Sequence, residues 1–150
     1  MASKTFHFPG FSIVSGDIKA DVSLNRFEKQ FQEAQFWLDG QVMTDMVPYM
    51  PHRDGAFVNL TRMRSAALQG TGKVVAGAPP QGRFLYEGKV MVDPVTGSPW
   101  ARKGAKKVVT ERPLTYSNPK ATPHWFDTAK EAHGKAWVKG VKRIAGGGKK

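Results

Sequence analysis

Two short motifs contain residue types that are used in phosphate chemistry, but neither is accompanied by the residues that would complete a site. The tripeptide HRD at positions 52–54 matches the start of a protein-kinase catalytic loop, yet no downstream metal-binding triplet or phosphate-covering glycine loop follows. Residues 70–73 (GTGK) match the end of a phosphate-binding loop, but Ala67 stands where its first glycine is required and Val74 replaces the hydroxyl residue that would bind magnesium. No Ser-His-Asp arrangement with an oxyanion motif is visible. We therefore expect that the protein is not an enzyme.

Metal-ligating residues are equally sparse. The four histidines, His7, His52, His124 and His133, do not have the spacing of metal ligands. His133 falls on the apolar face of a predicted C-terminal helix, where a packing role is the expected one. The absence of cysteine excludes a thiolate site and a disulfide framework. We expect neither a metal nor any other cofactor.

The strongest candidate for a binding surface is a cluster of positive charge beside an indole. Arg102, Lys103, Lys106 and Lys107 lie a few residues after Trp100. Cationic side chains of this kind bind phosphates, and an indole can stack on a base. Solvated lysines explain the charge equally well, and for Trp100 an aromatic anchor of a local hairpin is the simpler interpretation.

The net charge of +11 is confined to the second half of the chain. Residues 1–72 contain seven Lys and Arg against seven Asp and Glu, whereas residues 73–150 contain sixteen against five. A one-sided field of this kind favours contact with nucleic acid or with an acidic protein surface. A basic surface without such a partner is an equally good interpretation of the charge alone.

The rest of the chain must pack against a long amphipathic helix, which the sequence predicts over residues 23–47. We expect Ser23 or Asn25 to cap its start, and Pro48 and Pro51 to end it. Apolar residues recur there in steps of three or four, at Leu24, Phe27, Phe31, Ala34, Leu38, Val42, Met46 and Tyr49. The opposite, polar face contains Arg26, Glu28, Lys29, Gln32, Glu33 and Asp39.

Shorter elements follow from alternation and turn residues. The alternating pattern of residues 1–22 predicts extended chain, with breaks at 9–10 and 15–17. A short helix is expected over residues 60–66, although a strand is the alternative there, and a strand is expected over residues 73–77. Residues 80–87 predict a short helix closed by Gly88. The other predicted elements are strands over 90–93 and 107–111, joined by the turn-rich residues 94–99, and a final helix from about 122 to 145.

At 150 residues the chain is most simply one domain with a substantial core. Its longest uncharged apolar run is far shorter than the roughly 20 residues that cross a bilayer, so no membrane contact is expected. The first residues lack the continuous apolar segment of a signal peptide, which favours synthesis in the cytosol. An N-terminal arm could cover the domain's own core or reach a neighbouring copy, and the sequence leaves both open.

Several stretches, taken in order, resemble a known family. They are residues 51–60 (PHRDGAFVNL), 83–89 (RFLYEGK) and 122–126 (TPHWF), with 90–94 (VMVDP) and 100–104 (WARKG) as a hairpin insertion. Their order resembles that of the minor capsid proteins of tailed bacteriophages, which belong with the neck and tail-completion proteins of long-tailed phages. The resemblance covers most of residues 18–145. The chain has Arg-Asp-Gly at positions 53–55 where the commoner pattern is Asp-Thr-Gly.

The resemblance implies an α+β fold, with a small, mostly antiparallel sheet packed against the long helix and the C-terminal helix. It covers a single domain over 18–145 with a hairpin insertion at about 89–118. Residues 1–17 have no counterpart in the family and are expected from their own pattern to form an N-terminal arm, and the glycine- and lysine-rich residues 146–150 are expected to form a flexible basic tail. The resemblance also implies a structural virion protein, assembled in the host cytoplasm. Such a protein forms a ring, commonly of six copies, around the DNA channel between the head-closing connector proteins and the tail-tube or tail-terminator proteins.

Under this hypothesis the unlike halves of the chain would supply the two unlike faces of a ring contact. The alternative function is that of a small basic nucleic-acid-binding protein. The candidates for contact with neighbouring subunits or with channel DNA are Trp100, Arg102, Lys103, Lys106, Lys107, Arg112, Phe84, Tyr86 and Arg53.

Overall fold

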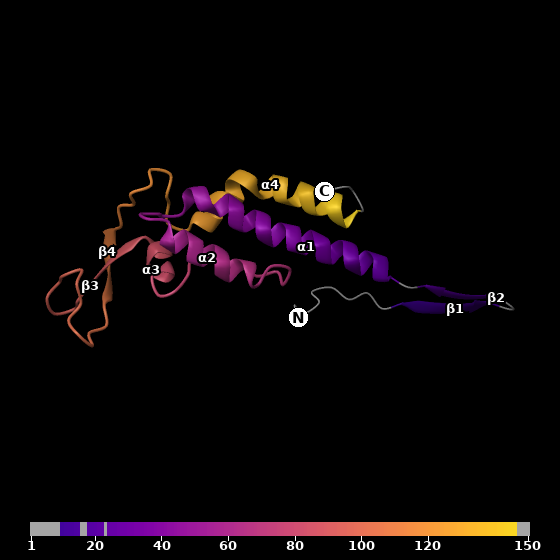
Figure 1. Cartoon of the computed structure of the whole chain (residues 1–150), viewed down its shortest axis with the longest axis horizontal. Helices are drawn as coiled ribbons and strands as arrows, with labels where there is room; N and C mark the ends of the chain where they lie inside the picture. Colours follow the sequence, from indigo (N-terminus) through magenta and orange to yellow (C-terminus); the bar gives the residue numbers. More distant parts are fainter. Residues whose placement is uncertain (1–9, 16–17, 23, 147–150) are drawn as a thin grey trace.

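The computed structural model describes residues 10–15, 18–22 and 24–146, and the structural statements below concern this part of the chain. Two long helices, α1 and α4, lie antiparallel and side by side and form the body of the molecule (Figure 1). In chain order the elements are β1 (Phe11–Ser15), β2 (Ile18–Val22), α1 (Asn25–Met46), the 3-10 turn η1 (Val47–Tyr49), α2 (Ala56–Ala66), α3 (Gly82–Glu87), β3 (Lys89–Val92), β4 (Val108–Pro113) and α4 (Trp125–Ala145). The expected α+β class is confirmed.

The strands form two antiparallel hairpins at opposite ends of the helical body (Figure 1). The β1–β2 hairpin lies beyond the start of α1, and its register pairs Phe11 with Val22 and Ser15 with Ile18. Residues 16–17, at the expected boundary between the arm and the domain, lie outside the described residues. Residues 1–9 of the expected arm and residues 147–150 of the expected tail lie outside the described residues.

The long helix α1 confirms the prediction for residues 23–47, but its faces differ from the expected ones. Glu28 and Asp39, which were assigned to the polar face, are each only 5% exposed, whereas Phe27 is half-exposed. Asp39 is buried because the loop after α2 folds over it and donates two backbone N–H groups to its carboxylate, from Gly70 at 2.8 Å and Gly72 at 3.0 Å. Helix α1 is therefore covered on two sides, by α4 and by α2 with its following loop.

The two ends of α1 differ in how well the sequence predicted them. No side chain caps its N-terminus, so the expected cap by Asn25 is wrong, and Ser23 lies outside the described residues. At the other end Pro48 lies within η1, and Met50 is extended before Pro51, as the steric restriction on the residue before a proline requires. The prolines thus end the α-helix where the sequence predicts.

Residues 73–77 do not form the expected strand. Their backbone groups bind side chains of helices instead of a neighbouring strand. Ser65 of α2 donates its hydroxyl to the carbonyl of Val75 at 3.1 Å and accepts the N–H of the same residue at 3.0 Å. Thr61 accepts the N–H of Ala78 at 3.0 Å. Two buried hydroxyls on one face of α2 therefore hold this segment as an ordered loop.

The two short helices confirm the sequence predictions. Helix α2 begins at Ala56, four residues before the expected start, because Gly55 takes a positive φ of 82° and Asp54 accepts the N–H of Ala56 at 3.0 Å. Helix α3 ends where Gly88 takes a φ of 68°. The N-terminus of α3 crosses close to the preceding loop, since a Cβ at Gly82 would overlap the backbone of Gly77.

The core lies where the C-terminal half of α1 meets α2 and α4. Its buried members are Val42, Met43, Met46, Met50, Val58, Trp125, Ala129 and Trp137. Both indoles have a partner for the ring N–H: Trp125 donates to the carbonyl of Ala76 at 2.9 Å and Trp137 to the carboxylate of Asp45 at 2.6 Å. The core is thus packed by apolar side chains, and the hydrogen bonds of the two indoles fix the orientation of the rings at its edges.

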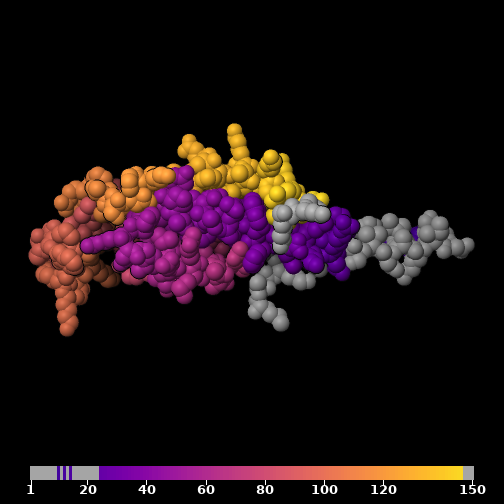
Figure 2. Space-filling model, turned by 45° about the horizontal axis from the view of Figure 1, so that its top comes forward, coloured from indigo at the N-terminus to yellow at the C-terminus, as the bar shows by residue number. Residues whose placement is uncertain are grey.

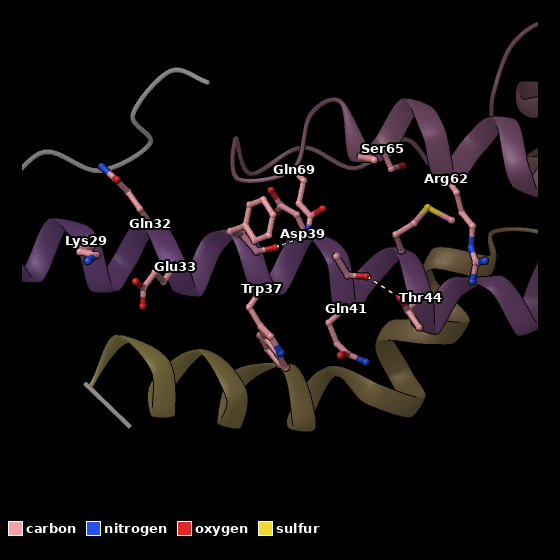
Figure 3. A pocket seen from close by; sticks show the side chains of 14 residues that line it. Lys29, Gln32, Glu33, Trp37, Asp39, Gln41, Thr44, Arg62, Ser65 and Gln69 are labelled. Atoms are coloured by element: carbon pink, nitrogen blue, oxygen red, sulfur yellow. Dashed lines mark hydrogen bonds between the residues drawn. The ribbon is translucent and has the colours of Figure 1, made fainter. Parts of the chain in front are cut away.

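Helix α4 approaches α1 closely where Gly140 faces Trp37. The indole of Trp37 points from α1 onto α4 (Figure 3), and a Cβ at position 140 would overlap its six-membered ring. Gly134, one and a half turns earlier on the same helix, has room for a Cβ, whose nearest neighbour would be Lys130 Cγ at 3.7 Å.

This contrast yields a matched pair of variants. Gly140→Ala is expected to lower the free energy of unfolding by about 1–2 kcal/mol, because overpacking costs about 1–3 kcal/mol and alanine regains up to about 1 kcal/mol of helix propensity. Gly134→Ala is expected to raise it by up to about 1 kcal/mol. Urea unfolding followed by circular dichroism measures both, and equal stabilisation by the two substitutions would contradict the close contact at Gly140.

Candidate functional site

The base of the β3–β4 hairpin is attached to the helical body by hydrogen bonds. Leu114 donates its N–H to the carbonyl of Gly88 at 2.8 Å, and the Tyr116 hydroxyl donates to the carbonyl of Leu85 at 2.6 Å. The Asn118 amide donates to the carbonyls of Pro48 and Met50, at 2.9 and 3.0 Å. Burial raises the pKa of Tyr116. These bonds set the direction in which the hairpin leaves the body.

The strands confirm the predicted hairpin, with Met91 opposite Val109 and Val92 opposite Val108. Nearer the base, β4 bulges outward between the pairs Met91–Val109 and Lys89–Pro113. Lys89 and Glu111 form an exposed cross-strand ion pair at 2.8 Å, and the hydrogen bond from Lys89 lowers the pKa of Glu111. Beyond the strands, residues 93–107 form a long connection, here called the hairpin tip.

A buried carboxylate organises the hairpin tip. Asp93 is fully buried, and its two oxygens accept the N–H groups of Val95 at 2.8 Å, Thr96 at 3.2 Å and Arg102 at 3.0 Å. The Arg102 guanidinium adds bonds from Nε at 2.9 Å and Nη2 at 3.3 Å. The hydrogen-bonded Arg102 side chain and these N–H groups hold the pKa of Asp93 well below its usual range. The tip is therefore folded around one charge.

This fold presents Trp100 to solvent. The indole is 85% exposed, while the Trp100 backbone N–H is bound by the Ser98 hydroxyl at 3.1 Å. The expectation that Trp100 anchors the hairpin is therefore wrong, because Asp93 does so instead. A large apolar side chain held outward by an ordered loop is typical of residues that dominate protein interfaces.

The cations of the hairpin tip divide into two kinds. Arg102 is held by Asp93, so its role is to position the loop. Lys103, Lys106 and Lys107 are exposed and form no ion pair within the described ranges. Exposed apolar residues accompany them on the same hairpin: Val95, Val108 and Val109. The hairpin thus combines an exposed indole, apolar neighbours and unpaired positive charge.

The other candidates lie in different places. Arg112 is exposed on β4, and Phe84 of α3 lines hollows beside the hairpin together with Lys107. Tyr86 packs inward with its ring centroid 4.9 Å from His124 and 4.8 Å from Trp125, and its pKa is raised, chiefly by desolvation. Arg53 is exposed in the loop before α2. The structure therefore gathers the residues of the hairpin and leaves Tyr86 and Arg53 apart from them.

Sequence reasoning missed Asp93, which it placed only as the end of a strand. The available signal was the run Asp93-Pro94-Val95-Thr96-Gly97, since an Asp side chain at the start of such a run commonly bonds the backbone N–H groups that follow. That Arg102 returns to the same carboxylate depends on the path of the chain, which no local pattern encodes.

The two phosphate-chemistry motifs have local structural roles. His52 Nδ1 lies 3.3 Å from the Met50 carbonyl oxygen, and Asp54 accepts the N–H of Ala56, the first residue of α2. In residues 70–73 the backbone N–H groups of Gly70 and Gly72 are bound to Asp39, and that of Thr71 is bound to the Leu68 carbonyl, so these three are not free for a phosphate. No group of three or more His, Cys, Asp or Glu residues that could hold a metal ion occurs in the part searched, residues 10–15, 18–22 and 24–146.

A hollow between α1 and α2 is lined by polar side chains whose hydrogen bonds are mostly internal (Figure 3). Asp39 also accepts a bond from Gln35 at 2.7 Å, Gln69 donates to the Phe36 carbonyl at 3.0 Å, and Thr44 donates to the Gly40 carbonyl. Asp39 and Gln69 hold the loop after α2 against α1, whereas the bonds of Gln35 and Thr44 lie within α1.

Among the described helices, none is both long enough and apolar enough to span a membrane. No protein-family model matches the sequence, and neither a curated protein nor a solved structure matches it.

Proposed function

We propose that this chain is a structural protein of the neck of a long-tailed phage, which assembles as a ring through its hairpin tip. The ring joins the head-closing connector proteins to the tail and surrounds the DNA channel. The observation that carries the assembly role is Trp100, 85% exposed on a loop that Asp93 holds rigid. The neck assignment is supported by the order of the sequence motifs.

The placement of the hairpin favours a contact between unlike surfaces. It projects from one end of an elongated body, with α1 and α4 extending away from it (Figure 1). A tip that binds the body of the next copy makes a heterologous contact, and such contacts generate rings when the rotation between copies closes. The valines and Trp100 would form the apolar centre of the contact, with the lysines at its rim.

Removing the hairpin tip tests the assembly role. Deleting all of residues 89–118 would also remove Tyr116 and Asn118, which attach the hairpin to the body. A cleaner variant replaces residues 93–107 by Asn-Gly, because Val92 and Val108 are direct partners and a two-residue turn fits that pairing.

The full-length protein is expected to form a discrete ring, and the tip-deleted protein a folded monomer. Light scattering after nuclease treatment at moderate salt gives the mass, and circular dichroism checks that α1 and α4 remain folded. Trp100→Ala alone should weaken assembly, typically by 2 kcal/mol or more at an interface hot spot. A tip-deleted protein that still forms normal rings would remove the tip from the interface. Recovery of the chain in purified tailed particles tests the neck assignment.

A nucleic-acid-binding protein is the second candidate, favoured by the unpaired Lys103, Lys106 and Lys107 beside Trp100. It predicts that the full-length protein stays a monomer and that its mass shifts only when DNA or RNA is restored. It also predicts that the tip deletion abolishes nucleic-acid binding.

A further inference from the structure

A second basic surface lies on α4, separate from the hairpin. It consists of Lys135, Lys139, Lys142 and Arg143, here called the α4 basic face, and all four side chains are exposed. At 3.6 residues per turn these positions fall within about a third of the helix circumference, on the side away from α1. Long side chains rise from this outer surface in Figure 2.

None of the four charges forms an ion pair within residues 24–146. The exposed Glu131 lies one turn before Lys135, and α4 has no acidic residue after it. Lysine and arginine in the last turn are favoured by the helix dipole, which explains Lys142 and Arg143 without a partner. It does not explain Lys135 and Lys139, because the effect is confined to the last turn.

We propose that the α4 basic face binds the sugar-phosphate backbone of duplex DNA without sequence preference, whereas the hairpin tip binds protein. This inference deepens the proposed function and rests on it, because only in the proposed ring does α4 lie beside a DNA channel. The two basic surfaces of one chain thereby have different partners.

The neighbours of the charges distinguish the two surfaces. The α4 basic face is bordered by the small residues Ala132 and Ala136 and by one half-exposed valine, Val138, whereas the hairpin presents an exposed indole together with three exposed valines. Protein interfaces need a buried apolar centre, while interfaces with DNA are more polar and much more positively charged. Small side chains between lysines also let a helix approach a phosphate backbone closely.

The dimensions of the face suit a duplex. Residues 135–143 extend about 12 Å along the helix axis at 1.5 Å per residue. Over that length a duplex has about seven phosphate charges, at one per 1.7 Å or so. Four cations on one side of a helix can therefore all find a phosphate at once.

The test uses the tip-deleted protein, in which the hairpin lysines are absent and assembly does not multiply the contacts. Its binding to a fluorescent duplex of random sequence is measured by anisotropy over a range of salt concentrations. With four phosphate contacts, the slope of log K against log salt is expected to be about −3.6, a loss of roughly a hundredfold or more between 50 and 200 mM. Replacing all four residues of the face by Gln should bring the slope close to zero.

A matched control removes the same charge elsewhere. Arg62, Arg64, Lys73 and Lys120 are exposed and form no ion pair in the described part of the chain, so their replacement by Gln changes net charge equally. This control is expected to keep the slope near −3.6.

The proposal is overturned if the tip-deleted protein does not bind DNA, which would leave the α4 basic face for an acidic protein surface. It is also overturned if the control lowers the slope as much as the α4 variant does. The mass of the full-length protein is measured separately. A monomer that binds DNA through α4 would contradict the proposed ring and support DNA binding by the α4 basic face. A ring that does not bind DNA would support the proposed ring and contradict DNA binding by this face.

Discussion

Asp93→Ala is expected to abolish ring assembly while the helical body stays folded. The substitution removes the acceptor for the N–H groups of Val95, Thr96 and Arg102 and leaves the guanidinium of Arg102 without its partner. The loop that holds Trp100 outward then samples many conformations, and binding requires that it be ordered again. A residue with no exposed surface would thus control a contact made by its neighbours.

Hydrogen exchange measures the loosening directly. The amides of Val95, Thr96 and Arg102 are expected to exchange at least about tenfold faster than in the unmodified protein, since each loses a bond to a charged group, worth about 1.5–3 kcal/mol. Asp54→Ala makes the same chemical change at an exposed turn and should leave these amides and the ring unchanged. Normal rings from the Asp93 variant would show that the contact does not depend on an ordered tip.

The same site has a defined pH dependence. The folded-state pKa of Asp93 lies below its unfolded value, so the carboxylate stabilises the tip fully above the ordinary carboxyl range. This stabilisation is lost as the pH falls below about 4 toward the folded-state pKa. The NMR chemical shifts of the Val95 and Thr96 amides should therefore stay constant from neutral pH to about 4 and change below it. In the Asp93→Ala variant they should show no such change.

Trp125→Ala is expected to cause the largest loss of stability in the described part of the chain. Trp125 is fully buried, packs edge-on against Tyr86 and Phe57, and donates its indole N–H to the Ala76 carbonyl. Loss of a buried Trp side chain costs about 3–5 kcal/mol, and an unpaired carbonyl adds about 1–3 kcal/mol. The total is comparable with the whole stability of many domains, about 5–15 kcal/mol.

Two further substitutions separate these contributions. Trp125→Phe keeps an aromatic ring but removes the N–H, so it should cost less than Trp125→Ala and still leave the Ala76 carbonyl unpaired. Trp100→Ala removes the same side chain from an exposed position and should change the free energy of unfolding of the dissociated monomer by less than about 0.5 kcal/mol. Chemical unfolding of the three variants gives the comparison, and a small effect of Trp125→Ala would refute the assigned core.

Much of the local structure was readable from the sequence. The readable signals act through steric and hydrogen-bonding effects within a few residues. They are the 3.6-residue periodicity of α1 and α4, the prolines after α1, Gly88 at the end of α3 and the turn residues between β3 and β4. The concentration of positive charge in the second half is also a property of the sequence alone.

What the sequence could not determine depends on contacts between distant residues. The composition of residues 73–77 suits a strand. In the structure the hydroxyls of Ser65 and Thr61 bind the backbone of Val75 and Ala78 instead. These hydroxyls reach the loop only after α2 has packed against it. Asp39 read as a surface residue because its burial requires the N–H groups of Gly70 and Gly72, more than 30 positions away.

The candidate site shows the same division. Its composition, an indole among lysines and arginines, was determined by the sequence and could be located within a few residues. Only the tertiary structure decided the roles: Asp93 organises the tip, Arg102 is held by it, and Trp100 is exposed. The physical reason is that one buried carboxylate needs several donors, and the folding of the chain alone determines which donors surround it.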